Sequence, residues 1–515
     1  MRSTDKNSNL VLIVLLISAC ITGLITQYLS FSNEYIYAYR DSIFRIDAAR
    51  RFIDAFNPGF FNQIGTVWLP LPNIILLPFA ANDFLWKTGL AGSIPGFILY
   101  LLNIAAIYKT FDLLLKDKFA VIIGSILYFT NPNILYFQTT PMSEQLYLTL
   151  FSASLYLLIK WIYEGNKRVL ICSGIAVALA SLTRYDAWVF ALFSSVLVFI
   201  ISYKKKNKPF LSFILFSLPA GLAVLWWLIH NYIYYKDSLE FMRGQFSTLH
   251  QLKWYEENGR LLTKYNLLLS LKVYFSDLML YSGLLSLILA GIGIAFYTFR
   301  NKINISGLML FLSVIAIPGS VIMLYLGQII IEIPDSVPLG YFNSRYGLYA
   351  FPGIVLFSGL AVSYIAGLLP KWKKTIQSIV IVALIFQLAF FLKDPVNNIA
   401  SIAEAEYAGY KNSETYKASL FLRDNYKGGN ILYDFSVFAL SPFCGISLKD
   451  RITYHTYLIG EKALKDPAAY AKWIMVYRKS SNDKVLNAII NYEKFQEYYN
   501  IAFSKDGLEL YKRKD

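Results

Sequence analysis

Cysteine and histidine, which build most disulfide frameworks and zinc sites, are scarce in this sequence. Among 515 residues there are three of each: Cys20, Cys172, Cys444, His230, His250 and His455. None of the cysteines lies at the short spacing from another that a disulfide framework or a zinc site requires. The sequence therefore indicates neither a disulfide framework nor a cysteine-based metal site.

Charged residues are also few. They make up 16% of the chain, against 56% hydrophobic and 17% aromatic residues. Such a chain carries too much apolar surface for a soluble globular protein. The net charge of +15 comes from 48 Lys and Arg against 33 Asp and Glu. In a membrane protein such a basic excess usually lies in cytoplasmic loops, so we expect no nucleic-acid partner.

Long apolar runs predict a polytopic membrane protein. The first run follows a short basic segment and is longer than the core of a cleaved signal peptide, so we expect a retained span. Windows of about 18 or more mostly apolar residues predict spans at 10–29, 84–108, 119–137, 145–163, 168–183, 187–203, 209–230, 277–298, 305–330, 347–368 and 375–392. The sequence thus predicts about eleven spans.

The connections between these spans predict the orientation. The strongly basic ones are the N-terminal tail and the loops 109–118, 164–168, 204–208, 300–302 and 371–374. By the positive-inside rule they face the cytoplasm. Since the number of spans is odd, the C-terminal segment then lies outside, together with the loop 31–83. We expect a multi-pass protein of the plasma membrane whose spans contact the lipid bilayer.

Hydropathy falls after Asp394, which divides the chain into a transmembrane domain, 1–394, and a soluble segment, 395–515. Within the soluble segment, residues 430–438 and 472–477 have strand character and 483–495 helix character. Residues 499–513 read as a hairpin that turns at Asp506-Gly507. The predicted fold is an all-α polytopic membrane protein with a small extracytoplasmic α/β domain at its C-terminus.

Charged residues gather in the predicted outer loops. They are Asp41, Arg45, Asp47, Arg50, Arg51, Glu144, Arg184, Asp186 and Arg345. Charges at a membrane interface or within a bilayer are costly, so they are candidates for function. All of them are predicted to lie near the same interface.

The first outer loop is predicted to contain a helix along the membrane surface, ending near 57–59. At about 100° per residue, Asp41 and Arg45 lie within about 40° of each other, whereas Asp41 and Asp47 lie about 120° apart. The two aspartates therefore do not share a face. One interpretation is two solvated i,i+4 pairs, Asp41 with Arg45 and Asp47 with Arg51. The other is that Asp41 is a catalytic base.

Glu144, Arg184 and Arg345 also allow two interpretations. Glu144 follows Ser143, so it suits the first turn of a helix, or it is a second acidic group facing a substrate. Arg184 and Arg345 either anchor span ends at the interface or bind a lipid phosphate, because the guanidinium fork suits phosphate and stays ionised.

Five segments carry a resemblance to a known family. They read RDSIFRIDAARRFIDAFNPGFFNQIGTVWLPLPN (40–73), NPNILYFQTTPMSE (131–144), LTRYDAW (182–188), HNYIYYKDSLEF (230–241) and FNSRYGL (342–348). In this order they resemble the GT-C superfamily of polyprenyl-phosphate-dependent glycosyltransferases, in its dolichyl-phosphate-mannose protein mannosyltransferase-like (glycosyltransferase family 39-like) branch. The motif WWDYG does not occur, so en bloc transfer of a glycan to asparagine is disfavoured.

The resemblance implies roles for several residues. Asp41 corresponds to the expected base or acceptor-binding group, and Glu144 to the second acidic position. Relatives often have histidine where this chain has Arg45, which argues against a metal role for the loop. A divalent cation is possible at the site but is not required, because arginine alone can meet a monophosphate leaving group. Donor-phosphate or substrate binding is expected from Arg184, Arg345, Arg45, Asp47, Tyr185, Asp186, Asn343 and Trp68.

The expected reaction moves a sugar from a polyprenyl-phosphate donor to an acceptor hydroxyl on the outer face. A base takes the acceptor proton while cations stabilise the departing phosphate. The acceptor, whether protein, lipid or cell-envelope polysaccharide, stays open. The alternatives are a transporter or flippase of lipid-linked sugars, which would place polar residues at mid-span in repeated halves, and a membrane scaffold whose soluble tail binds a partner.

Overall fold

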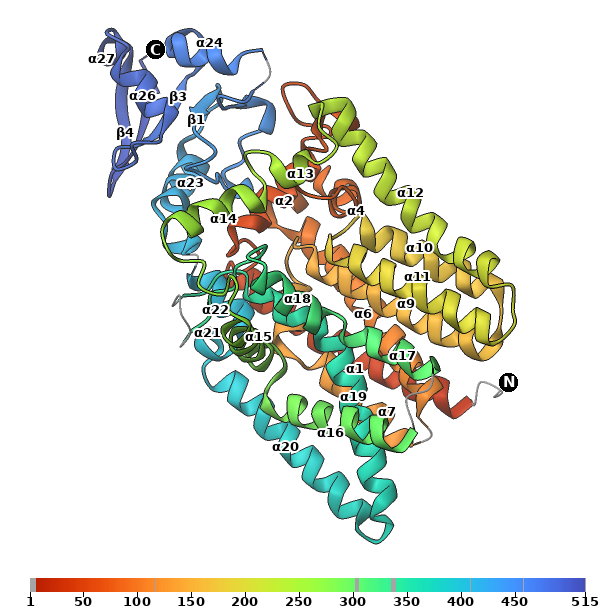
Figure 1. Cartoon of the computed structure of the whole chain (residues 1–515). Helices are drawn as coiled ribbons and strands as arrows, with labels where there is room; N and C mark the ends of the chain where they lie inside the picture. Colours follow the sequence, from red (N-terminus) through yellow and green to blue (C-terminus); the bar gives the residue numbers. More distant parts are fainter. Residues whose placement is uncertain are drawn as a thin grey trace.

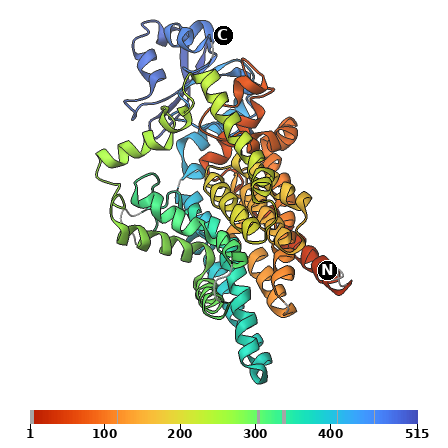
Figure 2. The ribbon, with the colours of Figure 1, turned by 45° about the vertical axis from the view of Figure 1, so that its right-hand side comes forward.

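The chain is a bundle of long helices with a small sheet-containing domain at one end (Figure 1). The computed structural model describes residues 6–115, 117–301, 305–334, 340–407, 409–456 and 458–514. The view in Figure 2 shows that the C-terminal domain caps the end of the bundle opposite the N-terminus.

Seven helices in the described part of the chain are long and apolar enough to cross a membrane, or up to nine if each of two bent pairs counts as one span. The seven are α1 (Lys6–Ser32), α6 (Leu90–Leu114), α9 (Glu144–Glu164), α11 (Asp186–Lys204), α12 (Pro209–Tyr235), α19 (Phe351–Leu368) with η2 (Ser344–Ala350), and α20 (Lys373–Lys393) with η3 (Pro370–Trp372). The protein is therefore a multi-pass membrane protein.

The bent pairs are α15 (Leu267–Ser282) with α16 (Leu284–Asn301), and a second pair made by α17 (Ile305–Phe311) and η1 (Leu312–Val314) with α18 (Ala316–Tyr325). The first pair bends by 111°. Gly283 stands at that bend with a φ of 78°, and a Cβ there would meet the Gln387 side chain at 2.4 Å. A side chain at this position would be strained in both backbone and packing.

The described residues thus contain fewer candidate spans than the eleven predicted. Predicted span 119–137 is two helices, α7 (Lys118–Phe129) and α8 (Pro132–Phe137). Pro132 begins the second helix because its ring cannot continue the first. Predicted span 168–183 is α10 (Lys167–Ser181), whose 15 residues rise only about 22 Å. It packs between α9 and α12. Although it is shorter than a hydrocarbon core, it returns the chain from the loop 164–168 to Arg184, which contacts Glu144 at the opposite end of α9.

Between α1 and α6 the chain forms four short helices at the capped end of the bundle (Figure 1). They are α2 (Arg40–Arg50), α3 (Phe60–Gln63), α4 (Leu71–Ala80) and α5 (Asp83–Thr88). The helix predicted in this loop is thus present as α2, although it ends at Arg50, well before the predicted end near 57–59. Two further helices, α13 (Glu240–Arg243) and α14 (Thr248–Glu257), lie in the loop after α12.

The C-terminal domain contains a five-stranded mixed sheet of order β2-β1-β3-β5-β4. Its strands are β1 (Ile431–Tyr433), β2 (Arg451–Ile452), β3 (Trp473–Tyr477), β4 (Tyr499–Lys505) and β5 (Leu508–Arg513). Strand β1 pairs in parallel with β2 and β3, while β5 pairs antiparallel with β3 and β4. The hairpin and the strand at 472–477 are confirmed, whereas the strand predicted at 430–438 is present only over Ile431–Tyr433. Asp506 and Gly507 have the positive φ angles, 50° and 97°, of a tight hairpin turn.

Helices connect the last span to this sheet and cover it. They are α21 (Pro395–Asn398), α22 (Ala400–Tyr407), η4 (Tyr410–Asn412), α23 (Glu414–Asn425), η5 (Pro442–Cys444), η6 (Leu448–Asp450), α24 (Gly460–Lys465), α25 (Pro467–Tyr470), α26 (Lys484–Ile490) and α27 (Phe495–Tyr498). The helix predicted at 483–495 is α26, capped by the Asp483 side chain. One apolar cluster includes α23 residues and another includes α26 residues, so the sheet is covered by helices on both faces.

Candidate active site

Glu144 lies at the centre of a cluster of charges where the bundle meets the C-terminal domain. It is the first residue of α9 and is fully buried. Its Oε1 accepts hydrogen bonds from Arg184 Nη1 at 3.1 Å and from the Tyr349 hydroxyl at 3.3 Å. The same oxygen lies 3.7 Å from Arg345 Nε. The two arginines compensate the burial of this carboxyl group.

Arg345 joins Glu144 to the first loop. Its Nη2 donates to Asp41 Oδ2 at 2.9 Å and to Asn343 Oδ1 at 3.3 Å. Asn343 has a left-handed φ of 55° just before η2, a conformation that asparagine tolerates better than most residues. The sharp turn at this residue presents the Arg345 side chain to the two carboxylates.

Arg184 completes the cluster from the turn between α10 and α11. Its Nε donates to Asp186 Oδ2 at 3.0 Å, and its guanidinium lies 4.5 Å from the centre of the Tyr349 ring. Together with the contact to Glu144, these interactions hold the guanidinium plane in one orientation. The structure thus brings together Asp41, Glu144, Arg184, Asp186 and Arg345, which come from four distant segments.

Arg45 adds a cation whose hydrogen bonds are not all made. It is buried on α2, and its guanidinium carbon lies 4.3 Å from the centre of the Trp68 ring. Its Nε and Nη1 are buried and have no hydrogen-bond partner among the described residues. Burial lowers the pKa of Arg45 to about 10, although Glu144 and Asp41 act to raise it. A buried guanidinium with free donors is suited to an anionic ligand.

Asp41 has the most open surface of the acidic groups in contact with Arg345. Its side chain keeps 38% of its surface exposed. Partial burial acts to raise the pKa of the Asp41 carboxyl, but Arg345, Arg45 and Arg40 outweigh it and hold that pKa below its usual value. The ion-pair partner of Asp41 is Arg345, and not the Arg45 that local spacing would pair with it.

Asp47 faces away from this cluster. Its Oδ1 accepts from Trp86 Nε1 at 3.0 Å and its Oδ2 from Arg451 Nη1 at 2.9 Å. Its ion-pair partner is therefore in the C-terminal domain, and not the Arg51 that local spacing suggests. The helical prediction that Asp41 and Asp47 lie on different faces is confirmed.

Tyr185 also serves packing. Its hydroxyl donates to the Val67 carbonyl at 2.9 Å, and its ring stacks on Phe241 with centres 4.9 Å apart. It therefore joins the first loop to the loop after α12 and does not contact the charge cluster through its hydroxyl.

Sequence reasoning missed Tyr349, Glu404 and Arg451. Tyr349 stands four residues after Arg345, one helical turn on, which is the only signal that could have identified it. Glu404 accepts from Asn343 N at 3.0 Å and from Ser344 Oγ at 2.6 Å. Glu404 and Arg451 lie in the segment after the last span, where no motif marks them.

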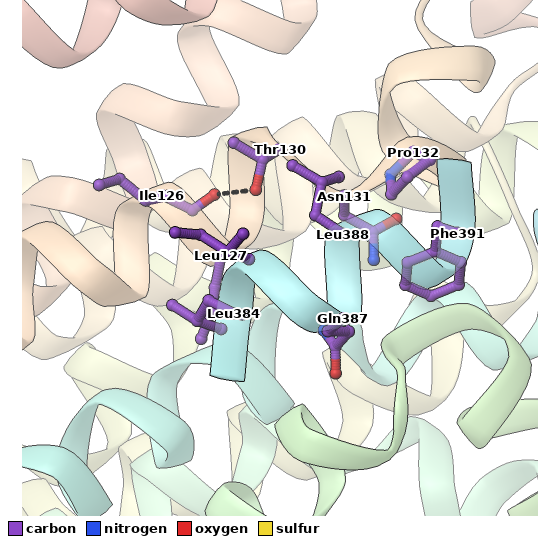
Figure 3. Close-up of a pocket in the computed structure, with 10 residues that line it drawn as sticks. Ile126, Leu127, Thr130, Asn131, Pro132, Leu384, Gln387, Leu388 and Phe391 are labelled. Atoms are coloured by element: carbon purple, nitrogen blue, oxygen red, sulfur yellow. Dashed lines mark hydrogen bonds between the residues drawn. The ribbon is translucent and has the colours of Figure 1, made fainter. Parts of the chain in front are cut away.

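Two cavities lie away from the charge cluster. An apolar groove of about 110 Å³ lies between the end of α7 and α20, where Leu127, Leu384 and Phe391 line it and Thr130 Oγ1 bonds back to the Ile126 carbonyl (Figure 3). A polar pocket of about 500 Å³ lies between the first loop and the C-terminal domain and is lined by Arg50, Ile53, Asp54, Asp83, Trp86, Lys87, Gly445, Ser447, Lys449 and Asp450. Within the described residues, no group of three or more His, Cys, Asp or Glu side chains could hold a metal ion.

Comparison with a family model relates the sequence to membrane glycosyltransferases. Residues 84–227 match the model described as dolichyl-phosphate-mannose-protein mannosyltransferase. This range includes Glu144 and Arg184. No curated protein matches the chain.

Solved structures of the same fold include two proteins. The Archaeoglobus fulgidus oligosaccharyltransferase, tethered with an acceptor peptide, has a TM-score of 0.52 at 11% identity, over 98% of this chain and 74% of its own. ArnT from Cupriavidus metallidurans bound to undecaprenyl phosphate has a TM-score of 0.52 at 11% identity, over 97% of both chains. Its apo state gives 0.54 at 10% identity, also over 97% of both chains. The resemblance predicted from the motifs thus agrees with the family model over residues 84–227 and with the fold of these solved structures.

Proposed function

We propose that this membrane glycosyltransferase transfers a sugar from a polyprenyl monophosphate to an acceptor hydroxyl, with Asp41 as the base. The observation that carries the proposal is Arg345, which contacts Asp41 at 2.9 Å and lies 3.7 Å from Glu144. A cation suited to phosphate and a carboxylate suited to an acceptor proton therefore lie side by side.

The donor phosphate binds to the arginines. Arg345 and Arg184 present guanidinium groups at the cluster, and Arg45 has unmade hydrogen bonds. Guanidinium binds phosphate in a bidentate manner and stays charged, so it stabilises the negative charge that develops on the departing phosphate. One of the solved ArnT structures is bound to undecaprenyl phosphate, which supports a lipid phosphate as the anion here.

Donor binding activates Asp41. In the free protein, Arg345 holds the pKa of Asp41 low, which makes Asp41 a weak base. A donor phosphate that takes up the Arg345 donors removes this partner, so the pKa of Asp41 rises when the donor is in place. The base then accepts the acceptor proton as the hydroxyl oxygen attacks the anomeric carbon and the bond to the phosphate oxygen breaks. A single displacement of this kind needs one base and inverts the anomeric centre.

Glu144 orients the arginines. It is fully buried and its charged neighbours are Arg184 and Arg345, which supports this role over direct contact with an acceptor. The charges lie at helix ends, Glu144 opening α9 and Asp186 opening α11. This placement disfavours the alternative of a transporter, whose polar groups line a path through the bilayer.

The site faces the outside of the plasma membrane in this proposal. The basic loops 164–168, 204–208 and 371–374 lie at the helix ends opposite Glu144 and Asp186, which by the positive-inside rule supports cytoplasmic placement of that end. The C-terminal domain is then extracytoplasmic. The acceptor, whether protein, lipid or polysaccharide, is the part of the proposal that the charge cluster leaves open.

A donor assay tests the proposal. Purified protein in nanodiscs is supplied with labelled polyprenyl-phosphate hexoses, with and without a membrane and cell-wall fraction as acceptor source. We expect one donor to be consumed and its label to appear in a product that mild acid, which cleaves the glycosyl phosphate, does not release. Consumption of none of the donors by folded protein would contradict the proposal.

A further inference from the structure

The segment after the last span contacts the two elements that carry the Asp41–Arg345 pair. One contact reaches α2, which carries Asp41, and the other reaches the turn that carries Arg345. The residues that make these contacts are Arg451 and Glu404. Arg451 supports the helix of Asp41, and Glu404 supports the turn of Arg345.

Arg451 holds α2 from the C-terminal domain. Its Nη1 donates to Asp47 Oδ2 at 2.9 Å, and both side chains are nearly without exposed surface. The same guanidinium donates to the Leu440 and Ile446 carbonyls, each at 3.1 Å. Because these two bonds are internal to the domain, Arg451 moves only with the domain. Asp47 is thus a buried point at which α2 is attached to the domain, besides the bond from Arg40 Nη2 to the Ser436 carbonyl at 3.2 Å.

A second attachment lies just beyond α2. Asp54 accepts from the backbone N–H groups of Leu448 and Lys449, each at 3.2 Å, and its other neighbour Arg50 donates to it at 3.0 Å. The end of α2 is therefore bonded to the turn that precedes Arg451. The attachments at Asp47 and at Asp54 lie at different positions along the chain, so together they resist rotation of α2 better than either does alone.

Glu404 holds the Arg345 turn in a similar way. Its two oxygens accept from Asn343 N and from Ser344 Oγ, the two residues that precede Arg345. Ser344 Oγ also lies 3.0 Å from the Tyr281 hydroxyl. Glu404 is buried on α22, in the connection between the last span and the sheet.

We infer that the segment after the last span is a positioning device for the site, in which Arg451 acts on Asp41 through Asp47 and Glu404 acts on Arg345 through its turn. The inference rests on the proposed function. On a helix of about 5–6 Å radius, a turn of about 20° moves a carboxylate by about 2 Å. Misplacement by about 1 Å can cost about 100-fold in rate. Loss of the Arg451 attachment therefore slows the reaction, and it also weakens donor binding because α2 carries Arg45 as well as Asp41.

A double-mutant cycle in the full-length protein tests the α2 arm. We expect Arg451→Met to lower kcat by about 10- to 100-fold and to raise the donor KM, because Arg45 moves with α2. Arg451→Lys should recover part of the rate because it keeps the charge. Asp47→Asn should lower kcat to a similar extent, and combining it with Arg451→Met should lower kcat no further than the poorer single variant, since all three lack the same attachment. If the two losses multiply in the double variant, Asp47 and Arg451 act independently, and the inference is overturned.

Glu404→Gln tests the other arm. One of its two accepted bonds is lost, so the donor KM should rise more than kcat falls. Glu406→Gln, two residues on, is the matched control and should leave both constants unchanged. An equal fall in kcat for Glu404→Gln and Glu406→Gln would count against a specific role for Glu404.

Hydrogen exchange separates positioning from unfolding. In Arg451→Met we expect faster exchange in residues 40–50 and unchanged exchange in β3 and β5. The control is Arg478→Met, which removes the pair with Glu509 on the open surface of the same domain and should alter neither region. Faster exchange throughout the domain, or none in residues 40–50, overturns the inference. If the wild type transfers no sugar, the proposed function fails, and hydrogen exchange still decides whether Arg451 fixes α2.

Discussion

The two faces of α2 carry the same chemical pair in different surroundings. Asp41 meets Arg345 and Asp47 meets Arg451, each with 2.9 Å between nitrogen and oxygen. On the first face the side chains keep 38% and 16% of their surface, whereas on the second they keep 5% and 4%. The distance between the partners therefore does not distinguish a site from an attachment; access to solvent and substrate does.

Acid–base behaviour follows the same division. Burial raises the pKa of Asp47 even though Arg451, Arg51 and Trp86 act to lower it. Burial also acts to raise the pKa of Asp41, but three arginines outweigh it and that pKa is lowered. Asp41 remains ionised beside an arginine that a ligand can take up, so it can take part in the reaction. Asp47 is buried away from solvent, so it can only stabilise the fold.

The largest expected effect is on the open face. Asp41→Asn removes the base, so we expect single-turnover transfer at saturating donor to fall by about 10²- to 10⁴-fold in protein that elutes as the wild type does. Asp83→Asn, at an exposed position in the same loop, is the control. Near-wild-type transfer by Asp41→Asn would remove the distinction between the faces.

A second contrast lies within the charge cluster. Glu144→Gln removes the buried negative charge that lies between Arg184 and Arg345, and it should lower the free energy of unfolding by about 3 kcal/mol. Asp186→Asn removes a partner of Arg184 whose side chain is 28% exposed, and should cost less than about 1 kcal/mol. Thermal unfolding in one detergent measures both. Equal losses would mean that burial does not govern these carboxylates.

The pH dependence of stability should have opposite signs for the two aspartates. The folded pKa of Asp41 is lowered, so its stabilising contribution is present above the unfolded value of about 3.9 and is lost as the pH falls through the folded pKa. The folded pKa of Asp47 is raised, so its contribution is largest below about 3.9 and is lost as the pH rises through the folded pKa.

Thermal midpoints between about pH 3.5 and pH 7 measure this difference. The gap between wild type and Asp41→Asn should widen with rising pH, by less than about 1 kcal/mol because the site is partly solvated. The gap between wild type and Asp47→Asn should narrow. Slopes of the same sign for both variants would contradict the assignment of one open and one closed face.

The smallest expected effect is at an exposed pair. Arg478 and Glu509 are 2.6 Å apart on the sheet, with 43% and 19% of their side-chain surfaces exposed. We expect Arg478→Ala to change the free energy of unfolding by less than about 0.5 kcal/mol. A larger loss, in the same thermal unfolding assay, would show that even open pairs stabilise this domain.

Local periodicity predicted the separation of Asp41 from Asp47, because helix geometry depends only on spacing along the chain. The resemblance correctly named Glu144, Arg184 and Arg345 as candidates that converge with Asp41. It could not pair them, since spacing suggests Arg45 for Asp41 and the partner is Arg345. The roles of Arg451 and Glu404 could not be predicted from the sequence, because no local pattern links them to α2 or to Asn343. The span predicted at 119–137 is two helices because Pro132 begins a new one, a break that hydropathy alone does not register.

The separation of Asp47 from Arg451 along the chain, 404 residues, has a consequence for the order of synthesis. At about 5–20 residues per second, translation places tens of seconds between the two partners. During that interval α2, with 11 residues, is shorter than a helix that is stable alone. The helix α2 is thus the first segment of the site to be synthesised and the last to be attached to its partner. A chain truncated before Arg451 would contain every proposed catalytic residue but would lack the contact that positions α2.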